Sequence, residues 1–296
     1  MNTSANTIGS CCEFIKNELN DLYPEREIHS LSDLIFMNVL GIPKHEIHLE
    51  KERTIENTQI LRIAEIIKDL KSYKPIQYIF GFTDFFGLHI HLSPDVLIPR
   101  PETEELVKWI IDDHKGKSPA ILDIGTGSGC IAFALKKNLP QSMVHASDIS
   151  DAALKMAKEN AEMHNLDIAF FHQDIIIDNL LIQMNKSLVN SVYDIIVSNP
   201  PYIPLKEKPF INRNIADFEP ENSLFVPDED PLIFYRNIAH FGMDHLNNNG
   251  HLYFEIHENS SDEVSTLIEK YGYGDIVIRR DINGKNRMIR CSKKNE

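Results

Sequence analysis

Four consecutive residues, Asn199-Pro200-Pro201-Tyr202, follow the apolar stretch YDIIVS (193–198), which is typical of a buried β-strand. Each proline fixes its own backbone φ angle and lacks an N–H donor, and the residue before a proline is restricted to extended conformations. We therefore expect the carbonyl group of Pro200 to be held rigidly, with the side-chain carbonyl of Asn199 and the flat ring of Tyr202 beside it. Two fixed acceptors next to an aromatic ring form a socket for a planar NH2 group.

A planar NH2 group, in a primary amide or in adenine, is a poor nucleophile because its lone pair is delocalised. Hydrogen bonds from its N–H groups to Asn199 Oδ1 and to the Pro200 carbonyl oxygen would place electron density on the nitrogen and turn its lone pair toward a sulfonium methyl group. Such ordering of two reactants is worth up to about 7–11 kcal/mol of the barrier, and preplaced dipoles stabilise the developing charge. No general base is evident, and the proton can leave after transfer. The other interpretation of these residues is a stiff loop without function.

A glycine-rich segment lies between an expected strand, AILDIG (120–125), and an expected helix, CIAFALKKN (130–138). Glycines allow a tight turn and let a ligand approach the backbone, and the helix N-terminus offers free N–H groups. A tight strand-to-helix turn without a ligand is the alternative. The candidate cofactor-binding residues of this segment are Gly125, Thr126, Gly127, Ser128 and Gly129.

Two further strand ends carry candidate cofactor-binding residues. Asp148, about 20 residues beyond the glycines, can accept both hydroxyls of a ribose; the alternative role, capping the next helix, suits Ser150 or Asp151 better. After the third strand, Ile175 can pack on an adenine ring with Asp174 near its amino group, because ligands bind beyond the C-terminal strand ends of open α/β sheets. These features fit NAD as well as S-adenosylmethionine, and the Asn-Pro-Pro-Tyr motif favours S-adenosylmethionine.

Strands and helices alternate from about residue 101 onward, which predicts an α/β fold with a mostly parallel sheet covered on both faces. The last two short strands, DIVIRR and RMIRC, are close enough to pair as an antiparallel hairpin at an edge. Before this region, residues 7–72 have helical periodicity, such as the apolar stripe of Leu31, Leu34, Ile35 and Val39 that ends at Gly41. FTDFFGLHIHL alternates around Gly87 as a β-hairpin does.

These patterns predict three segments. Residues 1–74 form a small helical domain, the natural candidate for docking a substrate, residues 75–99 form a β-hairpin linker, and residues 100–296 form the catalytic domain.

Composition narrows the possible functions. The 296 residues carry a net charge of −14, which disfavours binding of free nucleic acid through bulk electrostatics. The 13 histidines and four cysteines form neither an HExxH motif nor a Cys/His cluster with zinc spacing, so we expect no metal. The scattered cysteines are typical of free thiols in a reducing compartment. Without a signal peptide or an apolar run of membrane-spanning length, the chain is expected to be cytoplasmic.

A larger set of motifs resembles one enzyme family. LIPRPETE combined with NPPY is the more specific part of this set, whereas many methyltransferases share the cofactor motifs. Together the motifs resemble the peptide-chain-release-factor glutamine methyltransferases, the HemK family, over nearly the whole chain. The motifs are KPIQYIFG (74–81), LIPRPETEELV (97–107), LDIGTGSGCIA (122–132), IVSNPPYIP (196–204) and FEPENSLF (218–225).

This resemblance implies a Rossmann-like class I methyltransferase domain with a mostly parallel seven-stranded sheet and S-adenosylmethionine as cofactor. It implies that the segment from Gly125 to Gly129 wraps the methionine part, that Asp148 holds the ribose, and that Ile175 lies by the adenine, at a position often aromatic in relatives. Asn199 would contact cofactor and substrate, and Asn199 to Tyr202 would grip the substrate glutamine. The implied partners are bacterial peptide chain release factors, methylated on the N5 nitrogen of the glutamine in their Gly-Gly-Gln motif.

The LIPRPETE segment carries residues without a definite role. Arg100, Pro101 and Glu102 are expected to line the same cleft, although a role for each does not follow from the sequence. Thr103, with Glu104 and Glu105 after it, fits the cleft and an ordinary helix start equally well.

Two other functions compete with glutamine methylation. Adenine N6 methylation of DNA or RNA would use the same Asn-Pro-Pro-Tyr chemistry, but the chain is acidic and lacks a basic, aromatic-rich recognition segment. A non-catalytic module that holds a release factor or ribosomal partner would not need the intact Asn-Pro-Pro-Tyr motif.

Overall fold

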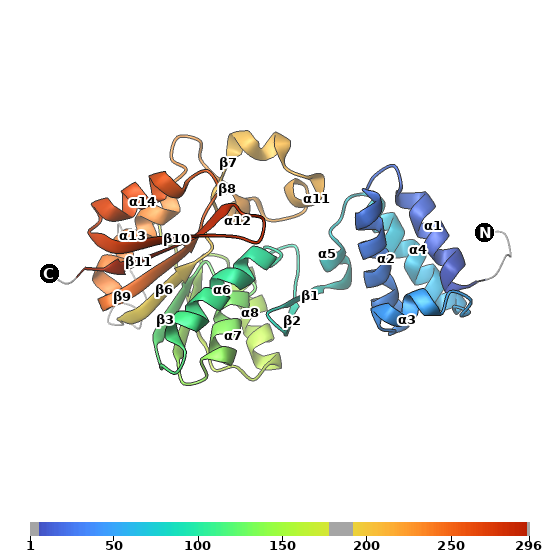
Figure 1. Cartoon of the computed structure of the whole chain (residues 1–296), viewed down its shortest axis with the longest axis horizontal. Helices are drawn as coiled ribbons and strands as arrows, with labels where there is room; N and C mark the ends of the chain where they lie inside the picture. The colour runs from blue at the N-terminus through green and yellow to red at the C-terminus, as the bar shows by residue number, and fades with distance from the viewer. Residues whose placement is uncertain (1–5, 178–191, 295–296) are drawn as a thin grey trace. The chain divides into compact units, whose positions relative to one another are not determined.

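The computed structural model describes residues 6–177 and 192–294. Contacts divide the chain into two compact units (Figure 1), Met1–Phe80 with Arg213–Phe218 and Gly81–Asn212 with Glu219–Glu296. The boundaries predicted from the sequence, after residues 74 and 99, stay predictions. None of the helices in the described ranges combines the length and the apolar character that a membrane span needs.

The first unit is a bundle of short helices around an apolar core. Thr7 caps the first helix, where its side chain accepts from Ser10 N, and Gly41 ends the second with φ +67°. Of the predicted apolar stripe, Ile35 is fully buried whereas Leu34 is 38% exposed. The guanidinium of Arg213 lies 4.4 Å from the ring centre of Tyr73, which attaches α11 to this unit. The helices are α1 (Ile8–Leu19), α2 (Glu25–Leu40), α3 (Lys44–Leu49), α4 (Asn57–Lys71), α5 (Ile76–Phe80) and α11 (Arg213–Ala216).

The second unit is built on the predicted seven-stranded α/β sheet. All neighbouring strands from β9 to β5 are parallel, and β11 pairs antiparallel with both β9 and β10. The expected C-terminal hairpin is therefore confirmed at one edge. In spatial order the strands are β10 (Tyr273–Arg280), β11 (Asn286–Lys293), β9 (Leu246–Glu255), β6 (Tyr193–Ser198), β3 (Ala120–Ile124), β4 (Met143–Asp148) and β5 (Ala169–His172).

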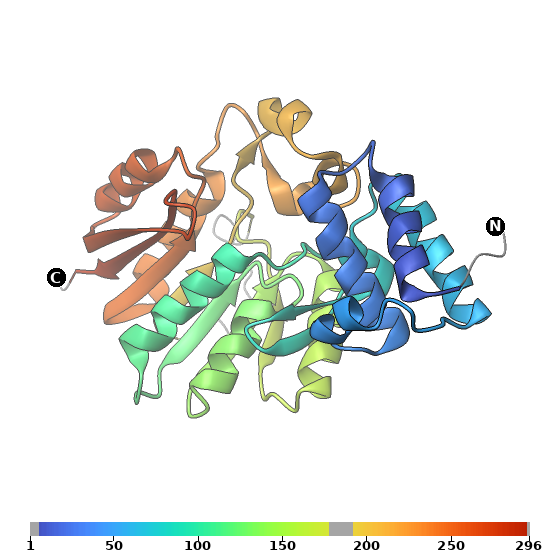
Figure 2. The same ribbon diagram turned by 45° about the vertical axis from the view of Figure 1, so that its right-hand side comes forward.

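Helices cover both faces of this sheet (Figures 1 and 2), as its near-continuous apolar strands require. Helices α6, α7 and α8 lie on one face, and α13 and α14 on the other, where Tyr235 and Val264 pack on Leu252 in a common core. The helix bounds are α6 (Pro101–His114), α7 (Cys130–Asn138), α8 (Asp151–Met163), α13 (Ile233–His245) and α14 (Ser261–Lys270).

The strand order reverses between β3 and β6, since the chain runs outward from β3 through β4 to β5 and then returns to the other side of β3. A crevice forms beyond the carboxyl ends of the strands at such a point. The short segments that follow β6 are β7 (Ile203–Pro204), the 3-10 helix η1 (Leu205–Phe210), α12 (Glu221–Leu224) and β8 (Phe225–Val226), with β7 and β8 pairing in parallel.

The predicted β-hairpin is present as β1 (Phe82–Phe85) and β2 (Leu88–His91), which pair antiparallel. His91 N donates to Asn160 Oδ1 at 2.8 Å, and Asn160 Nδ2 donates back to His91 O at 3.0 Å. This reciprocal pair ties the hairpin to α8 through a fully buried asparagine.

The turn from β3 into α7 contains three glycines with positive φ, at Gly125 (+73°), Gly127 (+55°) and Gly129 (+88°). L-residues with a side chain are strained in this region. Gly129 has a second constraint, because a Cβ atom there would overlap the fully buried ring of Phe133.

Replacing Gly129 with alanine is therefore expected to lower the free energy of unfolding in urea by about 2–5 kcal/mol, from backbone strain and overpacking together. Gly116→Ala is the matched control: this glycine also has positive φ (+77°), but a Cβ atom there would meet nothing within 4 Å. It should lose only about 1–2 kcal/mol. Equal losses in the two variants would contradict the close contact with Phe133.

Candidate active site

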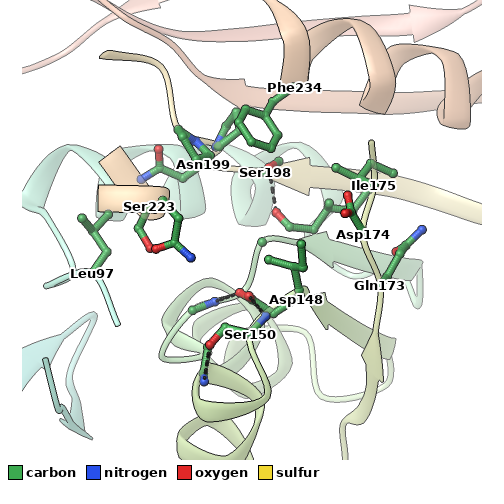
Figure 3. Close-up of a pocket in the computed structure, with 18 of the residues that line it drawn as sticks. Leu97, Asp148, Ser150, Gln173, Asp174, Ile175, Ser198, Asn199, Ser223 and Phe234 are labelled. Carbon is green, nitrogen blue, oxygen red and sulfur yellow. Dashed lines mark hydrogen bonds between the residues drawn. The ribbon is translucent and has the colours of Figure 1, made fainter. Parts of the chain in front are cut away.

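A cavity of about 230 Å³ lies in the second unit at the carboxyl ends of β3, β4, β5 and β6, where the strand order reverses (Figure 3). The ends of these four strands and several of the segments that follow them contribute to the cavity wall. The lining residues used below are Leu97, Gly125, Gly127, Asp148, Asp174, Ile175, Asn199, Pro200, Pro201, Asn222, Ser223 and Phe234.

The glycine turn exposes its backbone to this cavity. Gly125 N and Thr126 N both donate to Ser147 O at 2.9 Å, which fastens the turn to β4. A Cβ atom at Gly125 or Gly127 would meet no atom within 4 Å, so a ligand can approach the chain closely there. The other predicted residues of the turn, Thr126, Ser128 and Gly129, are not among the lining residues.

These other residues shape the turn from behind. Thr126 is 4% exposed, and its Oγ1 donates to Asp123 Oδ2 at 2.7 Å. Burial raises the pKa of Asp123 to about 7, partly opposed by that hydrogen bond. Gly129 is the N-cap residue of α7. Thr126, Ser128 and Gly129 can therefore affect a ligand in the cavity only by setting the backbone conformation of Gly125 and Gly127.

Asp148 lies at the end of β4 with both carboxylate oxygens engaged (Figure 3). Its Oδ2 accepts from Gly127 N at 2.8 Å and its Oδ1 accepts from Ser150 N at 2.9 Å. Burial raises the pKa of Asp148, while these backbone hydrogen bonds lower it. Ser150 is the N-cap of α8 and accepts from Ala153 N, so Asp148 is not the helix cap. Each carboxylate oxygen retains further acceptor capacity.

Apolar side chains form the opposite wall. Ile175 is 7% exposed and lines the cavity next to Asp174, whose Oδ1 accepts from Ile176 N at 2.9 Å and shapes the turn after β5. Phe234 on α13 faces the same space (Figure 3). Sequence reasoning missed Phe234, because the alternation of strands and helices does not show which face of a helix meets the cavity.

The predicted socket residues are partly brought together. Ser198 Oγ donates to Ile124 O at 2.7 Å and fastens the end of β6 to β3. Asn199, Pro200 and Pro201 then line the cavity. Tyr202 does not line it.

The side chain of Tyr202 is instead half-buried and packs against the apolar core of the sheet. Its hydroxyl donates to Glu255 Oε1 at 3.1 Å, and burial raises its pKa. Its ring centre lies 6.0 Å from that of His257. The predicted ring face for the NH2 socket is therefore not on the cavity wall in this structure.

Most of the LIPRPETE segment lies outside the cavity and supports the residues that line it. Arg100, Pro101 and Glu102 do not line the cavity, whereas Leu97 does. Arg100 Nη2 forms an ion pair of 2.5 Å with Glu219 Oε1, and Glu219 Oε2 accepts from Ile98 N at 3.1 Å.

Glu219 is 5% exposed. The pair therefore braces the segment that carries Leu97 against the segment that carries Asn222 and Ser223. Both braced segments belong to motifs quoted from the sequence, but roles for Leu97, Asn222 and Ser223 were missed.

Thr103 is found at the predicted helix start and is not among the residues that line the cavity. It lies in the first turn of α6, 2% exposed. Asn199 Nδ2 donates to Thr103 Oγ1 at 3.3 Å, and Thr103 Oγ1 donates to Glu255 Oε2 at 2.6 Å. Glu255, at the end of β9, is 1% exposed, and burial raises its pKa. Sequence reasoning missed Glu255.

Comparisons with known proteins cover most of the chain. The family "PrmC N-terminal domain" matches residues 13–81, and the family "Methyltransferase small domain" matches residues 103–216. The "Release factor glutamine methyltransferase" of Flavobacterium psychrophilum is 42% identical over 278 residues, which cover 93% of this chain and 95% of the relative. The protein of the same name from Bacteroides thetaiotaomicron is 41% identical over 280 residues, 95% of this chain and 98% of the relative.

The chain belongs to the release factor glutamine methyltransferase family. This confirms the resemblance and makes the protein a methyltransferase enzyme with S-adenosylmethionine as its methyl donor. The solved hMettl16 catalytic domain in complex with MAT2A 3′UTR hairpin 1 shares the fold alone, with a TM-score of 0.56 at 16% identity over 93% of each chain.

The cavity of this family member fits the methyl donor in its chemistry. The open backbone at Gly125 and Gly127 leaves room for the donor's amino-acid part, the carboxylate of Asp148 suits ribose hydroxyls, and Ile175 and Phe234 offer apolar surface to adenine.

Asp148→Ala is expected to weaken binding of S-adenosylmethionine about 100- to 10,000-fold, because two hydrogen bonds to a charged acceptor are lost. Turnover at saturating donor should change less. Calorimetric titration measures the affinity, and Asp151→Ala, which removes an exposed carboxylate three residues along, is the control. Unaltered donor binding by Asp148→Ala would count against the ribose role.

Proposed function

We propose that this enzyme transfers the methyl group of S-adenosylmethionine to the N5 side-chain nitrogen of the glutamine in the Gly-Gly-Gln motif of peptide chain release factors, and thereby supports translation termination. The names of the relatives support the release factor as substrate. One observation carries the chemical part of the proposal: Asn199 and Pro200 line the same cavity as the glycine turn and Asp148.

Each cavity residue receives a role in this proposal. Gly125 and Gly127 hold the methionine part of the donor, on a turn shaped by Thr126, Ser128 and Gly129. Asp148 binds the ribose, and Ile175 packs against the adenine. When bound, the donor supplies an electrophilic methyl group on sulfur.

Asn199 and Pro200 orient the glutamine amide in front of that methyl group. The Asn199 side chain donates to Thr103 through Nδ2, so Oδ1 is the end that can accept an N–H of the substrate. The carbonyl oxygen of Pro200 accepts the second N–H from a backbone that two prolines make rigid. Pro201 walls the site, and Tyr202 anchors the corner through its hydroxyl.

These two acceptors stabilise the transition state more than the ground state. As the nitrogen attacks, its N–H groups become more acidic and their hydrogen bonds strengthen. Because the two acceptor dipoles are already in place, they stabilise this developing charge without reorganisation. The extra proton leaves the nitrogen after the methyl group has arrived, and no general base is required.

Two further parts of the proposal concern the substrate as a whole. The helical segment 1–74 docks the release factor. A separate family, the PrmC N-terminal domain, matches residues 13–81, which supports a role of its own for this segment. Release factors act on ribosomes, so the enzyme is proposed to work in the cytoplasm and to bind neither membranes nor nucleic acid directly.

Label transfer tests the substrate. Purified protein is incubated with S-adenosylmethionine that carries a labelled methyl group, a release factor, and DNA or RNA in separate reactions. Mass spectrometry of the release factor should locate one added methyl on the Gly-Gly-Gln glutamine, and a release factor with Gln→Glu at this position, which lacks the NH2 group, should stay unlabelled. Label in nucleic acid alone would replace this proposal with adenine N6 methylation.

Asn199→Ala is expected to lower kcat about 100- to 1,000-fold, as loss of one preplaced dipole does elsewhere, while the donor affinity changes less than about threefold. Steady-state kinetics with a release factor and calorimetry with S-adenosylmethionine measure the two quantities. Asn248→Ala, at an exposed position away from the cavity, is the control. A large loss of donor affinity at normal turnover would contradict the socket.

A further inference from the structure

The side-chain amide of Asn199 has two chemically opposite ends. Its oxygen accepts hydrogen bonds and its NH2 group donates them, and a half-turn of the amide exchanges the two. Only the oxygen can accept an N–H of a substrate amide. With the NH2 end toward the substrate, two donors would face each other and the socket would reject its substrate, so some feature of the site must select one orientation.

Thr103 makes this selection through the direction of its own hydrogen bond. A threonine hydroxyl has one hydrogen and two acceptor lone pairs. Thr103 Oγ1 donates to Glu255 Oε2 at 2.6 Å, and the other oxygen of Glu255 accepts from Tyr202, so the single hydrogen of Thr103 is committed to Glu255. Thr103 can then offer Asn199 nothing but a lone pair, and the NH2 end of Asn199 faces it at 3.3 Å.

Glu255 is itself held in place from the other end of the corner. Its Oε1 accepts from the hydroxyl of Tyr202 at 3.1 Å, and its carboxylate is 1% exposed. The hydrogen bonds therefore run from Asn199 through Thr103 to Glu255, and from Tyr202 to the same carboxylate, spanning Pro200 and Pro201. In this series of hydrogen bonds every donor is directed along the path toward Glu255, so only one orientation of the Asn199 amide satisfies them all.

The side-chain oxygen of Asn199 is available to accept a hydrogen bond from a ligand. Asn199 Oδ1 has no hydrogen-bond partner among the residues that the structure describes, and Asn199 lines the cavity.

We propose that Thr103 and Glu255 are positioning residues that lock the Asn199 amide with its oxygen toward the methyl-accepting nitrogen. This proposal rests on the proposed function and adds an explanation of its selectivity. The locked site offers only hydrogen-bond acceptors, so the nitrogen that it methylates must carry two N–H bonds. A glutamate or a hydroxyl group in the same place cannot satisfy both acceptors.

A purely structural role is the competing explanation, since a buried hydroxyl–carboxylate pair also joins α6 to β9. Removing it would cost stability under either explanation. The two differ in whether Thr103 acts through Asn199, and a double-mutant cycle measures this coupling.

Thr103→Val keeps the shape of the side chain and removes the hydroxyl, whereas Thr103→Ser keeps the hydroxyl. We expect Thr103→Val to lower kcat toward a release factor at least about tenfold, with the affinity for S-adenosylmethionine unchanged within about twofold. Thr103→Ser should restore most of the turnover. Ser142→Ala controls for loss of a buried hydroxyl, because Ser142 Oγ has no hydrogen-bond partner within the described ranges.

In the cycle, Thr103→Val combined with Asn199→Ala should be no slower than Asn199→Ala alone, since there is no amide left to orient. Multiplication of the two losses, or equal turnover of the Val and Ser variants, would overturn the positioning role.

A second readout does not depend on the substrate. In protein labelled with ¹⁵N-asparagine, with Asn199→Ala used for assignment, the side-chain NH2 signal of Asn199 should shift in Thr103→Val and stay in Thr103→Ser. An unmoved signal in Thr103→Val would overturn the proposal. If this shift is observed while wild-type protein leaves release factors unmethylated, the proposed function fails and the amide lock stands.

Discussion

Two adjacent prolines at the end of β6 impose the constraint on which the site depends. Pro200 and Pro201 fix two φ angles and remove two N–H donors, so the backbone leaves the sheet along a stiff path that lines the cavity. Ser198 secures the start of this path on β3, and Tyr202 secures its end on Glu255. A mobile chain would have to order these acceptors in every catalytic cycle, at the cost of part of the rate gain from orientation.

The sheet topology places that stiff corner beside the residues proposed to bind the donor. The strand order reverses between β3 and β6, so the glycine turn and the proline corner leave neighbouring parallel strands at the same edge. Asp148 hydrogen-bonds both Gly127 and Ser150, which couples the carboxylate meant for the ribose to the turn meant for the amino-acid part. The residues proposed to bind the donor and those proposed to bind the substrate thus lie at the same edge of the sheet.

Much of this arrangement was predictable because it depends on local patterns. The strands at 120–125 and 193–198 and the helix at 130–138 follow from apolar periodicity, and the structure places them within about two residues of those bounds. Glu255 was not predictable, because its bond to Thr103 joins residues 152 positions apart and appears only once α6 lies on β9. Phe234 depends similarly on the rotation of α13 against the sheet. The position of the Tyr202 ring was likewise not predictable, because its hydroxyl donates to Glu255, which is 53 positions away in the sequence.

The most direct test of the account is a crystal structure with the demethylated donor, S-adenosylhomocysteine, and a release factor bound together. The account predicts that the side-chain nitrogen of the substrate glutamine lies within about 3.5 Å of both Asn199 Oδ1 and the carbonyl oxygen of Pro200, facing the sulfur of the bound product. A glutamine bound elsewhere, or an Asn199 that turns its NH2 group toward the glutamine nitrogen, would contradict it.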